Sequence, residues 1–256
     1  MTAYEKVAAV RSEKRPTAIS YINRIVTDPI MLYGDRQYGN DPAVIGGIGM
    51  IGDIPVTYVA TERGNTIEER VRRNFGCPKP EGYRKALRLM KQAEKFRRPI
   101  LTIIDTSGAY CGKDAEERGQ GEAIARNILE MSGLRTPVIA LIIGEGESGG
   151  ALGIGVADRV FMLENAVYSV ISPEGCASIL FGDSSKAGEA AESLKITSED
   201  MARFGVIDGI IHEKFERFNM MCTEIRDILY GEYRKLLDLS DEDLIAGRYE
   251  KFRKII

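Results

Sequence analysis

Residues 138–155, VIALIIGEGESGGALGIG, join a continuous apolar run to a segment rich in glycine. The apolar run, 138–143, is typical of a strand that is buried on both faces of a parallel sheet. The glycine-rich segment matches three motifs: G-x-G-x-x-G from Gly144, G-x-S-x-G from Gly146, and a Gly-Gly turn that opens a small-residue helix. The choice among these motifs determines which fold and which chemistry the sequence predicts.

The same arrangement occurs once more on the N-terminal side. Residues 100–106, ILTIIDT, form another apolar run, and residues 107–109, SGA, follow it. Helical patterns over 83–97 and 116–134 precede the two runs, and this alternation predicts a parallel sheet with right-handed crossovers. Ligands of parallel sheets bind at the carboxyl ends of the strands, so we expect both glycine-bearing ends to line one site.

The remaining elements follow from turn and periodicity signals. We expect short helices and a loop over 1–40, a hairpin over 43–60, a loop over 61–82, a short helix over 151–157, strands over 159–165 and 166–171, a new helix after Gly175, and a mostly helical tail over 213–256.

The composition is that of a globular protein with a sizeable core, since apolar residues make up 44% of the chain and charged residues 29%. The net charge of −3 argues against a general nucleic-acid binder. The first residues, MTAYEKVAAVRSEKRP, contain no apolar h-region, so we expect no secretory signal there. No apolar run approaches the ~20 residues of a membrane span. The cysteines form no C-x-x-C pair, so we expect neither a zinc ribbon nor a disulfide framework. This cysteine usage is typical of a protein in a reducing cytoplasm, which is the location that we expect.

The first motif would bind a dinucleotide, and Glu164 stands where an acid that binds ribose is expected. Three features oppose this hypothesis. Glu145 and Glu147 would place negative charge against a pyrophosphate, the following helix is short and contains two glycines, and the motif lies in the middle of the chain.

The second motif would make Ser148 a hydrolase nucleophile, with Asp183 or Asp208 as the acid and His212 as the base, in the expected chain order. A serine of this kind normally opens a long helix, whereas here two strands follow almost at once. The chain also has no HGGG-type loop for the oxyanion. We therefore expect Ser148 to shape a turn.

The third motif needs no side-chain chemistry. Small residues let a ligand oxygen approach the backbone closely, and two N–H groups near a helix N-terminus form an oxyanion hole. Close packing of strand and helix would also explain one such glycine segment. It explains two segments at neighbouring strand ends less well.

The sequence resembles the crotonase superfamily, and within it the carboxyltransferase α subunits of multi-subunit acetyl-CoA carboxylases. The resemblance covers roughly 34–182 and the tail at 241–252. Its stretches are GDRQYGNDPAVIGGI, RRNFG, PEGYRKALRLM, IDTSGAY, AEERGQGEAIARN, IGEGESGGALGIGVADRVFMLENAVYSVISPEGCASILF and DEDLIAGRYEKF. The sequence departs from the family at Ser107 and Cys111, where proline is usual, and at Gly146-Glu147, where Gly-Gly is common.

The resemblance implies an α/β crotonase-like spiral of ββα units with helical N- and C-terminal extensions. It divides the chain into an extension over 1–40, a carboxyltransferase domain over 41–212, and a helical tail over 213–256. It implies that the chain, with a β subunit, transfers the carboxyl group of carboxybiotin to acetyl-CoA and gives malonyl-CoA for fatty acid biosynthesis. A carboxyltransferase subunit for another acyl-CoA and a non-catalytic acyl-CoA-binding subunit are the alternatives.

The resemblance also implies the partners and the site. The partners are a zinc-ribbon β subunit in an α2β2 assembly, a biotin carboxyl carrier protein and biotin carboxylase. Biotin belongs to the carrier, and no metal is implied for this chain. Gly149 and Gly150 are expected to donate to the biotin carbonyl oxygen, with Gly108 and Ala109 on the facing strand end.

Residues 70–98 are strongly basic, with only Glu81 and Glu94 as acids. Such a segment is often simply a solvated face. A functional interpretation is contact with CoA phosphates or an acidic partner through guanidinium–phosphate pairs, while RNA binding is less favoured because aromatic residues are sparse. The candidates for these contacts are Arg72, Arg73, Lys79 and Arg84.

Overall fold

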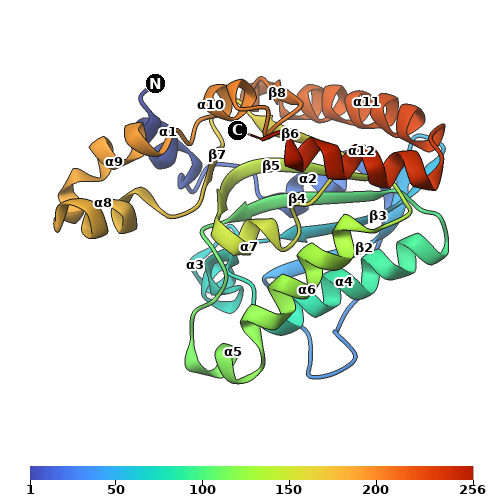
Figure 1. Ribbon diagram of the computed structural model, residues 1–256, viewed down its shortest axis with the longest axis horizontal. Helices are drawn as coiled ribbons and strands as arrows, with labels where there is room; N and C mark the ends of the chain where they lie inside the picture. The colour runs from blue at the N-terminus through green and yellow to red at the C-terminus, as the bar shows by residue number, and fades with distance from the viewer. Residues whose placement is uncertain (256) are drawn as a thin grey trace.

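The sheet at the centre of the molecule is mixed, with strand order β1-β2-β3-β4-β5-β6-β8 and β7 beside the end of β5 (Figure 1). The computed structural model describes residues 1–255. β1, β2 and β3 pair antiparallel, and the pairs from β3 onward are parallel. The strands are β1 (Thr27–Met31), β2 (Val44–Ile51), β3 (Ile54–Thr61), β4 (Ile100–Thr106), β5 (Val138–Glu147), β6 (Arg159–Leu163), β7 (Val167–Ser169) and β8 (Gly209–Ile211).

Helices cover both faces of this sheet, with α4 and α6 side by side below it in Figure 1 and α11 above it. As a result, every residue of β4 and β5 is buried. The helices are α1 (Ala3–Val10), α2 (Ala18–Ile25), α3 (Ile67–Arg72), α4 (Pro80–Lys95), α5 (Lys113–Glu117), α6 (Gln120–Ser132), α7 (Ser148–Leu152), α8 (Pro173–Phe181), α9 (Ala187–Leu194), α10 (Ser198–Arg203), α11 (Phe218–Leu237) and α12 (Asp241–Arg253), with 3-10 turns at Asn74–Gly76, Ser184–Lys186 and Phe215–Arg217. None of these helices is long and apolar enough to cross a membrane.

A buried ion pair fixes α12 to the body of the protein. Arg248 is 1% exposed and donates to both carboxylate oxygens of Asp158, at 2.8 and 2.9 Å. Its guanidinium also donates to the carbonyl oxygens of Met131, Leu134 and Thr136. A buried charge is tolerated when it is paired and hydrogen-bonded in this way. The C-terminal helix is thereby attached to the end of α6 and the start of β6.

The structure confirms the hairpin, the two buried strands, the two strands that follow α7, and the helical tail. The predicted helix over 116–134 is wrong in one respect, because Gly119, with a φ of 82°, separates α5 from α6. The helix predicted at 83–97 begins three residues earlier, at Pro80, whose fixed φ suits a first helical turn. The predicted loop over 61–82 contains α3, and β1 falls within the helices and loop expected for 1–40.

The prediction for the glycine segment also needs a correction. Residues 144–147 continue β5 instead of forming a loop, because β7 pairs with this end of the strand, from Glu145 with Val167 to Glu147 with Ser169. The short helix therefore begins at Ser148 rather than at residue 151.

Candidate functional site at the ends of β4 and β5

The turn between β5 and α7 is sharp. Ser148 makes it in the left-handed backbone region, with a φ of 56°. Residues other than glycine rarely adopt this conformation, so the surrounding structure holds the turn. Ser148 is exposed, Gly149 is half-buried and Gly150 is buried. These three residues open α7, and the first N–H groups of a helix have no acceptor within it.

Gly150 lies directly against the loop that follows β4. A Cβ atom added to Gly150 would lie 2.5 Å from the nitrogen of Ala109 and 2.7 Å from the Cα of Gly108, closer than real Cβ atoms approach. Gly108 has a φ of 131°, in the region that favours glycine. The hydroxyl of Thr106 holds this loop, since it accepts from the Gly108 N–H at 3.2 Å and donates to the Gly108 carbonyl at 2.8 Å. The two glycine-bearing strand ends therefore meet.

Backbone donors remain free at this junction. Within residues 1–255, no hydrogen bond uses the N–H of Ala109, Gly149 or Gly150. The N–H of Gly108 differs, because it is bonded to Thr106, which leaves Ala109 as the available donor from the β4 side. The buried hydroxyl of Tyr83 donates to the carbonyl of Gly150 at 3.0 Å and fixes the orientation of the turn. Adjacent, preorganised N–H groups of this kind are what a backbone oxyanion hole requires.

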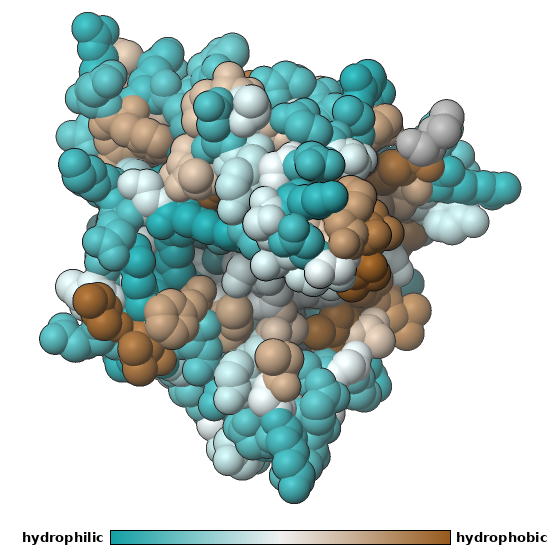
Figure 2. Space-filling model, turned by 90° about the vertical axis from the view of Figure 1, so that its left-hand side faces the viewer, coloured by the Kyte–Doolittle hydropathy of each residue, from teal (hydrophilic) through white to brown (hydrophobic). Residues whose placement is uncertain are grey.

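An apolar hollow of about 560 Å³ opens beside Gly149. Its walls include side chains from α7, α9, α10 and the segments next to them, among them Leu152, Leu194, Met201 and Phe204. The face that Figure 2 turns toward the viewer is hollowed near its centre and carries apolar patches on both sides. A dry wall beside unpaired N–H groups strengthens any hydrogen bond that a ligand makes there.

Three buried carboxyl groups lie near the same strand ends, a feature that the sequence interpretation missed. Asp105 accepts from the N–H of Glu145 at 3.1 Å, and its other oxygen lies 3.2 Å from Nε of Arg63. Arg11 donates to Glu145 at 2.6 Å. Glu147 is 2% exposed, and one of its oxygens has no partner within the described chain. Burial, together with the charge of Glu145, raises the pKa of Glu147 to about 8, so this carboxyl group is mostly neutral at pH 7.

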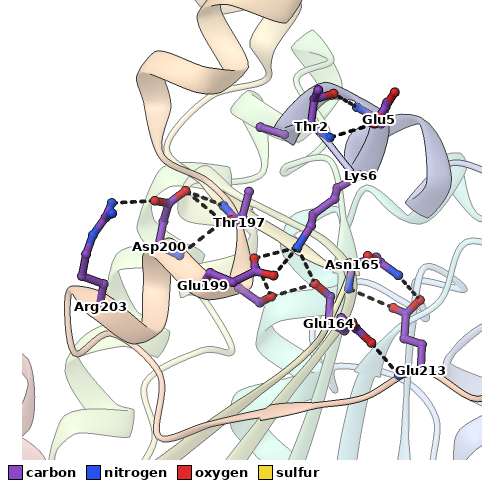
Figure 3. Close-up of polar contacts among 12 residues, drawn as sticks. Thr2, Glu5, Lys6, Glu164, Asn165, Thr197, Glu199, Asp200, Arg203 and Glu213 are labelled. Carbon is purple, nitrogen blue, oxygen red and sulfur yellow. Dashed lines mark hydrogen bonds and ion pairs between the residues drawn. The ribbon is translucent and has the colours of Figure 1, made fainter.

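Figure 3 shows a polar network that includes Glu164, the residue on which the dinucleotide hypothesis depends. Lys6 of α1 donates to the carboxylate of Glu199 at 2.6 Å and to the carbonyl of Glu164 at 3.0 Å. The Glu164 carboxylate accepts from the N–H of Glu213 at 3.3 Å and lies 3.4 Å from Nδ1 of His212. Glu164 and His212 therefore make contacts that hold the end of β6 and the residues after β8.

The helix and the serine agree with this conclusion. α7 has only five residues, too few for the helix that either motif normally opens. His212 is exposed, and no hydrogen bond within residues 1–255 joins it to Ser148. Residues 1–255 also contain no group of three His, Cys, Asp or Glu side chains that could hold a metal ion.

The four basic candidates do not form one surface. Arg84 is paired with the buried carboxylate of Asp35 at 2.8 Å. Lys79 lies 3.6 Å from the carboxylate of Asp114. Arg72 and Arg73 line one small pocket, and Arg84 lines a different one. The basic segment is therefore divided between separate ion pairs and separate pockets.

Solved structures of other proteins share this fold. The solved structure of transcarboxylase 12S, with methylmalonyl-coenzyme A and methylmalonic acid bound, matches with a TM-score of 0.68 at 18% identity, over 88% of this chain and 44% of that chain. The β subunit of geranyl-CoA carboxylase from Pseudomonas aeruginosa matches with a TM-score of 0.66 at 17% identity, over 97% of this chain and 45% of that chain. The fold is that of the crotonase-like carboxyltransferases, as the sequence predicts.

The relatives in sequence then identify the family. The acetyl co-enzyme A carboxylase carboxyltransferase-like family matches residues 1–256, and the chain belongs to it. The acetyl-coenzyme A carboxylase carboxyl transferase subunit alpha of Bacillus cytotoxicus is 52% identical over 259 residues, which cover 100% of this chain and 80% of that protein. The subunit alpha of Ruminiclostridium cellulolyticum is 51% identical over 255 residues, which cover 100% of this chain and 98% of that protein.

A further relative is longer than this chain. The Clostridium tetani protein named acetyl-coenzyme A carboxylase carboxyl transferase subunits beta/alpha is 52% identical over 259 residues. This chain spans 45% of the length of that relative.

Proposed function

We propose that this chain is the α subunit of an acetyl-CoA carboxylase carboxyltransferase. Together with a β subunit it transfers the carboxyl group of carboxybiotin to acetyl-CoA, and the product is malonyl-CoA, the first committed intermediate of fatty acid biosynthesis. The observation that carries this proposal is the identity of 52% and 51% to two α subunits along the whole chain. The unpaired backbone donors at the ends of β4 and β5 support it.

The reaction places developing negative charge on two oxygens, one in the ureido group of biotin and one in the thioester of acetyl-CoA. Preorganised N–H donors lower the energy of such a transition state. We assign the N–H groups of Gly149 and Gly150, with Ala109 opposite, to the ureido oxygen. Biotin, when bound, supplies the carboxyl group and a basic ureido nitrogen, so this chain needs no histidine or carboxylate as a base.

The residues beside these donors fit a biotin ring, which is apolar apart from its ureido group. Leu152, Met201 and Phe204 line the hollow next to Gly149 and would hold the ring against the turn. Their apolar surface would also exclude water from the carboxyl group during transfer. Ser148 lines the same hollow and shapes the turn without acting as a nucleophile.

A β subunit would supply the donors for the thioester oxygen. The Clostridium tetani relative joins beta and alpha in its name, which supports the association of the two. This chain also exposes large apolar side chains, including Val170, Ile179 and Leu180, which a permanent partner would cover. The proposal also includes a zinc ribbon in the β subunit and an α2β2 assembly. Its further partners are the biotin carboxyl carrier protein and biotin carboxylase, and its location is the cytoplasm.

Reconstitution tests the proposal. The chain is mixed with an acetyl-CoA carboxylase β subunit, and malonyl-CoA formation from acetyl-CoA and carboxybiotin is followed, with the chain alone and the β subunit alone as controls. We expect product only from the mixture. Binding of acetyl-CoA by the mixture without any product would instead favour a non-catalytic acyl-CoA-binding subunit. A faster reaction with propionyl-CoA than with acetyl-CoA would reassign the acyl substrate.

A further inference from the structure

A second pocket lies apart from the strand-end turn, at the β2 side of the sheet, and its chemistry is different. It encloses about 170 Å³ and is bordered by residues next to β1, β2, α3 and α4. Three strand pairings, β2 with β3, β3 with β4 and β4 with β5, separate this side of the sheet from β5, the strand that precedes Gly149. None of the residues assigned to the biotin oxygen lines this pocket.

The charged side chains of this pocket are all cationic. They are Arg72, Arg73 and Lys85, and no carboxylate lines the pocket with them. The ammonium group of Lys85, 1% exposed, donates to the side-chain oxygen of Asn40 at 2.8 Å and to the carbonyls of Asp41 and Val44. These acceptors satisfy its hydrogen bonds, but carbonyl and amide oxygens leave its positive charge in place.

Arg73 is the residue that points to a ligand. It is 8% exposed, and its guanidinium donates to the carbonyl of Pro42 at 2.8 Å. The Glu69 carboxylate lies 3.9 Å away and belongs to a partly exposed side chain. The buried Nε–H of Arg73 has no hydrogen-bond partner in the described chain. An unpaired donor on a buried charged group is costly, and an acceptor in the pocket would remove that cost.

The neighbouring groups lead to the same conclusion. Burial lowers the pKa of Lys85 to about 8, and the positive charges of Arg88 and Arg73 add to this effect against the opposing influence of Asp41. The carboxylate of Asp41 accepts from the backbone N–H groups of Ala43 and Lys79, which leave its negative charge in place beside Lys85. Arg72 and Arg73 share one carboxylate, that of Glu69, at 3.9 Å from each, so one positive charge of the pair is left for an anion to balance.

We infer that this pocket binds a small oxyanion, either a phosphoryl or a carboxylate group, held by the Arg73 Nε–H and the Arg72 guanidinium. Both groups offer the planar donor geometry that suits such oxygens. Asn40 and Tyr33, whose side chains carry further donors, line the same pocket. Apolar side chains such as Leu32 and Ile45 form the rest of the wall, which limits competition from water.

The test is calorimetric titration of the full chain with sodium phosphate and, separately, with sodium acetate, at constant ionic strength set by sodium chloride. We expect saturable binding with a Kd on the order of 1 mM or below, and a rise in Tm with the same anion. Binding of phosphate alone identifies the phosphoryl source, and binding of acetate identifies the carboxylate source. Absence of saturable binding for both anions overturns the inference.

Variants locate the site. Arg73→Gln should weaken binding at least tenfold, and Arg72→Gln, an exposed side chain that does not threaten the fold, should weaken it severalfold. Arg203→Gln on α10 removes the same charge far along the chain and should leave the Kd unchanged. Equal affinity of the wild type and the Arg72→Gln and Arg73→Gln variants would show that the anion binds elsewhere and would overturn the assignment.

Discussion

Gly150 lies so close to Ala109 that a Cβ atom on the glycine would be 2.5 Å from the backbone nitrogen of the alanine. This contact joins the end of β5 to the loop after β4. The preceding residue, Gly149, is different, because a Cβ there would meet only Ile124, at an ordinary 3.5 Å. The two adjacent glycines therefore have separate tasks: Gly150 permits the close approach, and Gly149 borders the apolar hollow.

The first prediction follows from this difference. Gly150→Ala should destabilise the chain by about 1–3 kcal/mol or more, the usual cost of forcing an extra carbon into a packed site. Gly149→Ala should cost far less, since its Cβ has room and alanine favours a helix. The free energy of unfolding in urea measures both changes. Equal losses for the two variants would contradict the packing of Gly150 against Ala109.

The second prediction concerns Ser148, which has a φ of 56° and lies in the turn. Ser148→Ala should keep most of the carboxyltransferase activity of the complex, because the hydroxyl performs no chemistry. Ser148→Gly should raise the Tm of the chain, because glycine adopts a positive φ without strain. An activity loss of about a thousandfold or more in Ser148→Ala would instead indicate a nucleophile.

The third prediction concerns Glu147, whose folded-state pKa of about 8 lies well above the value near 4.3 of an unfolded glutamate. Between these two pH values the folded chain keeps a proton that the unfolded chain has lost. The contribution of Glu147 to stability is therefore present below pH 4 and falls as pH rises toward 8. The variant Glu147→Gln cannot ionise at this position, so its free energy of unfolding should not show this fall with rising pH.

Unfolding free energies of the wild type and of Glu147→Gln, measured at several pH values from 4 to 8, check this prediction. The difference in favour of the variant should grow steadily with pH. Parallel pH profiles would show that Glu147 ionises at an ordinary pH and that its carboxyl group is solvated.

The fourth prediction addresses the attachment of α12. Arg248→Met leaves the carboxylate of Asp158 buried without its cation, and removal of one partner of a buried pair typically costs about 3–5 kcal/mol. The double variant Arg248→Met with Asp158→Asn should recover part of this loss, because it removes both charges. A double variant less stable than Arg248→Met would mean that the charge of Asp158 is balanced by other groups.

Periodicity and turn chemistry predicted much of this fold. The apolar runs at β4 and β5 identified the buried strands, and glycine after each run identified the strand ends that meet at Gly150 and Gly108. β5 extends to Glu147 because β7 pairs with its end. β7 is close in sequence, but the chain first forms α7 and β6 before β7 reaches β5. Glu145 and Glu147, two residues apart where β5 pairs regularly with β7, share one side of the strand, and this period of two was the available signal for their burial.

The basic segment shows a limit of sequence patterns. Charge counts alone did not distinguish Arg84, which pairs with the buried Asp35, from Arg73, whose Nε–H is unpaired. Asp35, which pairs with Arg84, and Pro42, which accepts from Arg73, both come from the segment before β2, far away along the chain. Only the tertiary structure could separate structural ion pairs from a candidate binding pocket.

The most direct test of the central claim is the turnover of the reconstituted αβ complex carrying Gly149→Val, with Gly231→Val on α11 as a matched control in open space. The valine side chain would crowd Ile124 at the turn whose N–H groups are assigned to the biotin oxygen. We predict that turnover with biotin substrates falls by roughly 10²–10³-fold, the scale of losing an oxyanion donor, while the KM for acetyl-CoA and the binding of the β subunit stay unchanged. A folded, β-bound Gly149→Val complex whose turnover falls by less than about tenfold would contradict the assignment of this turn to the biotin oxygen.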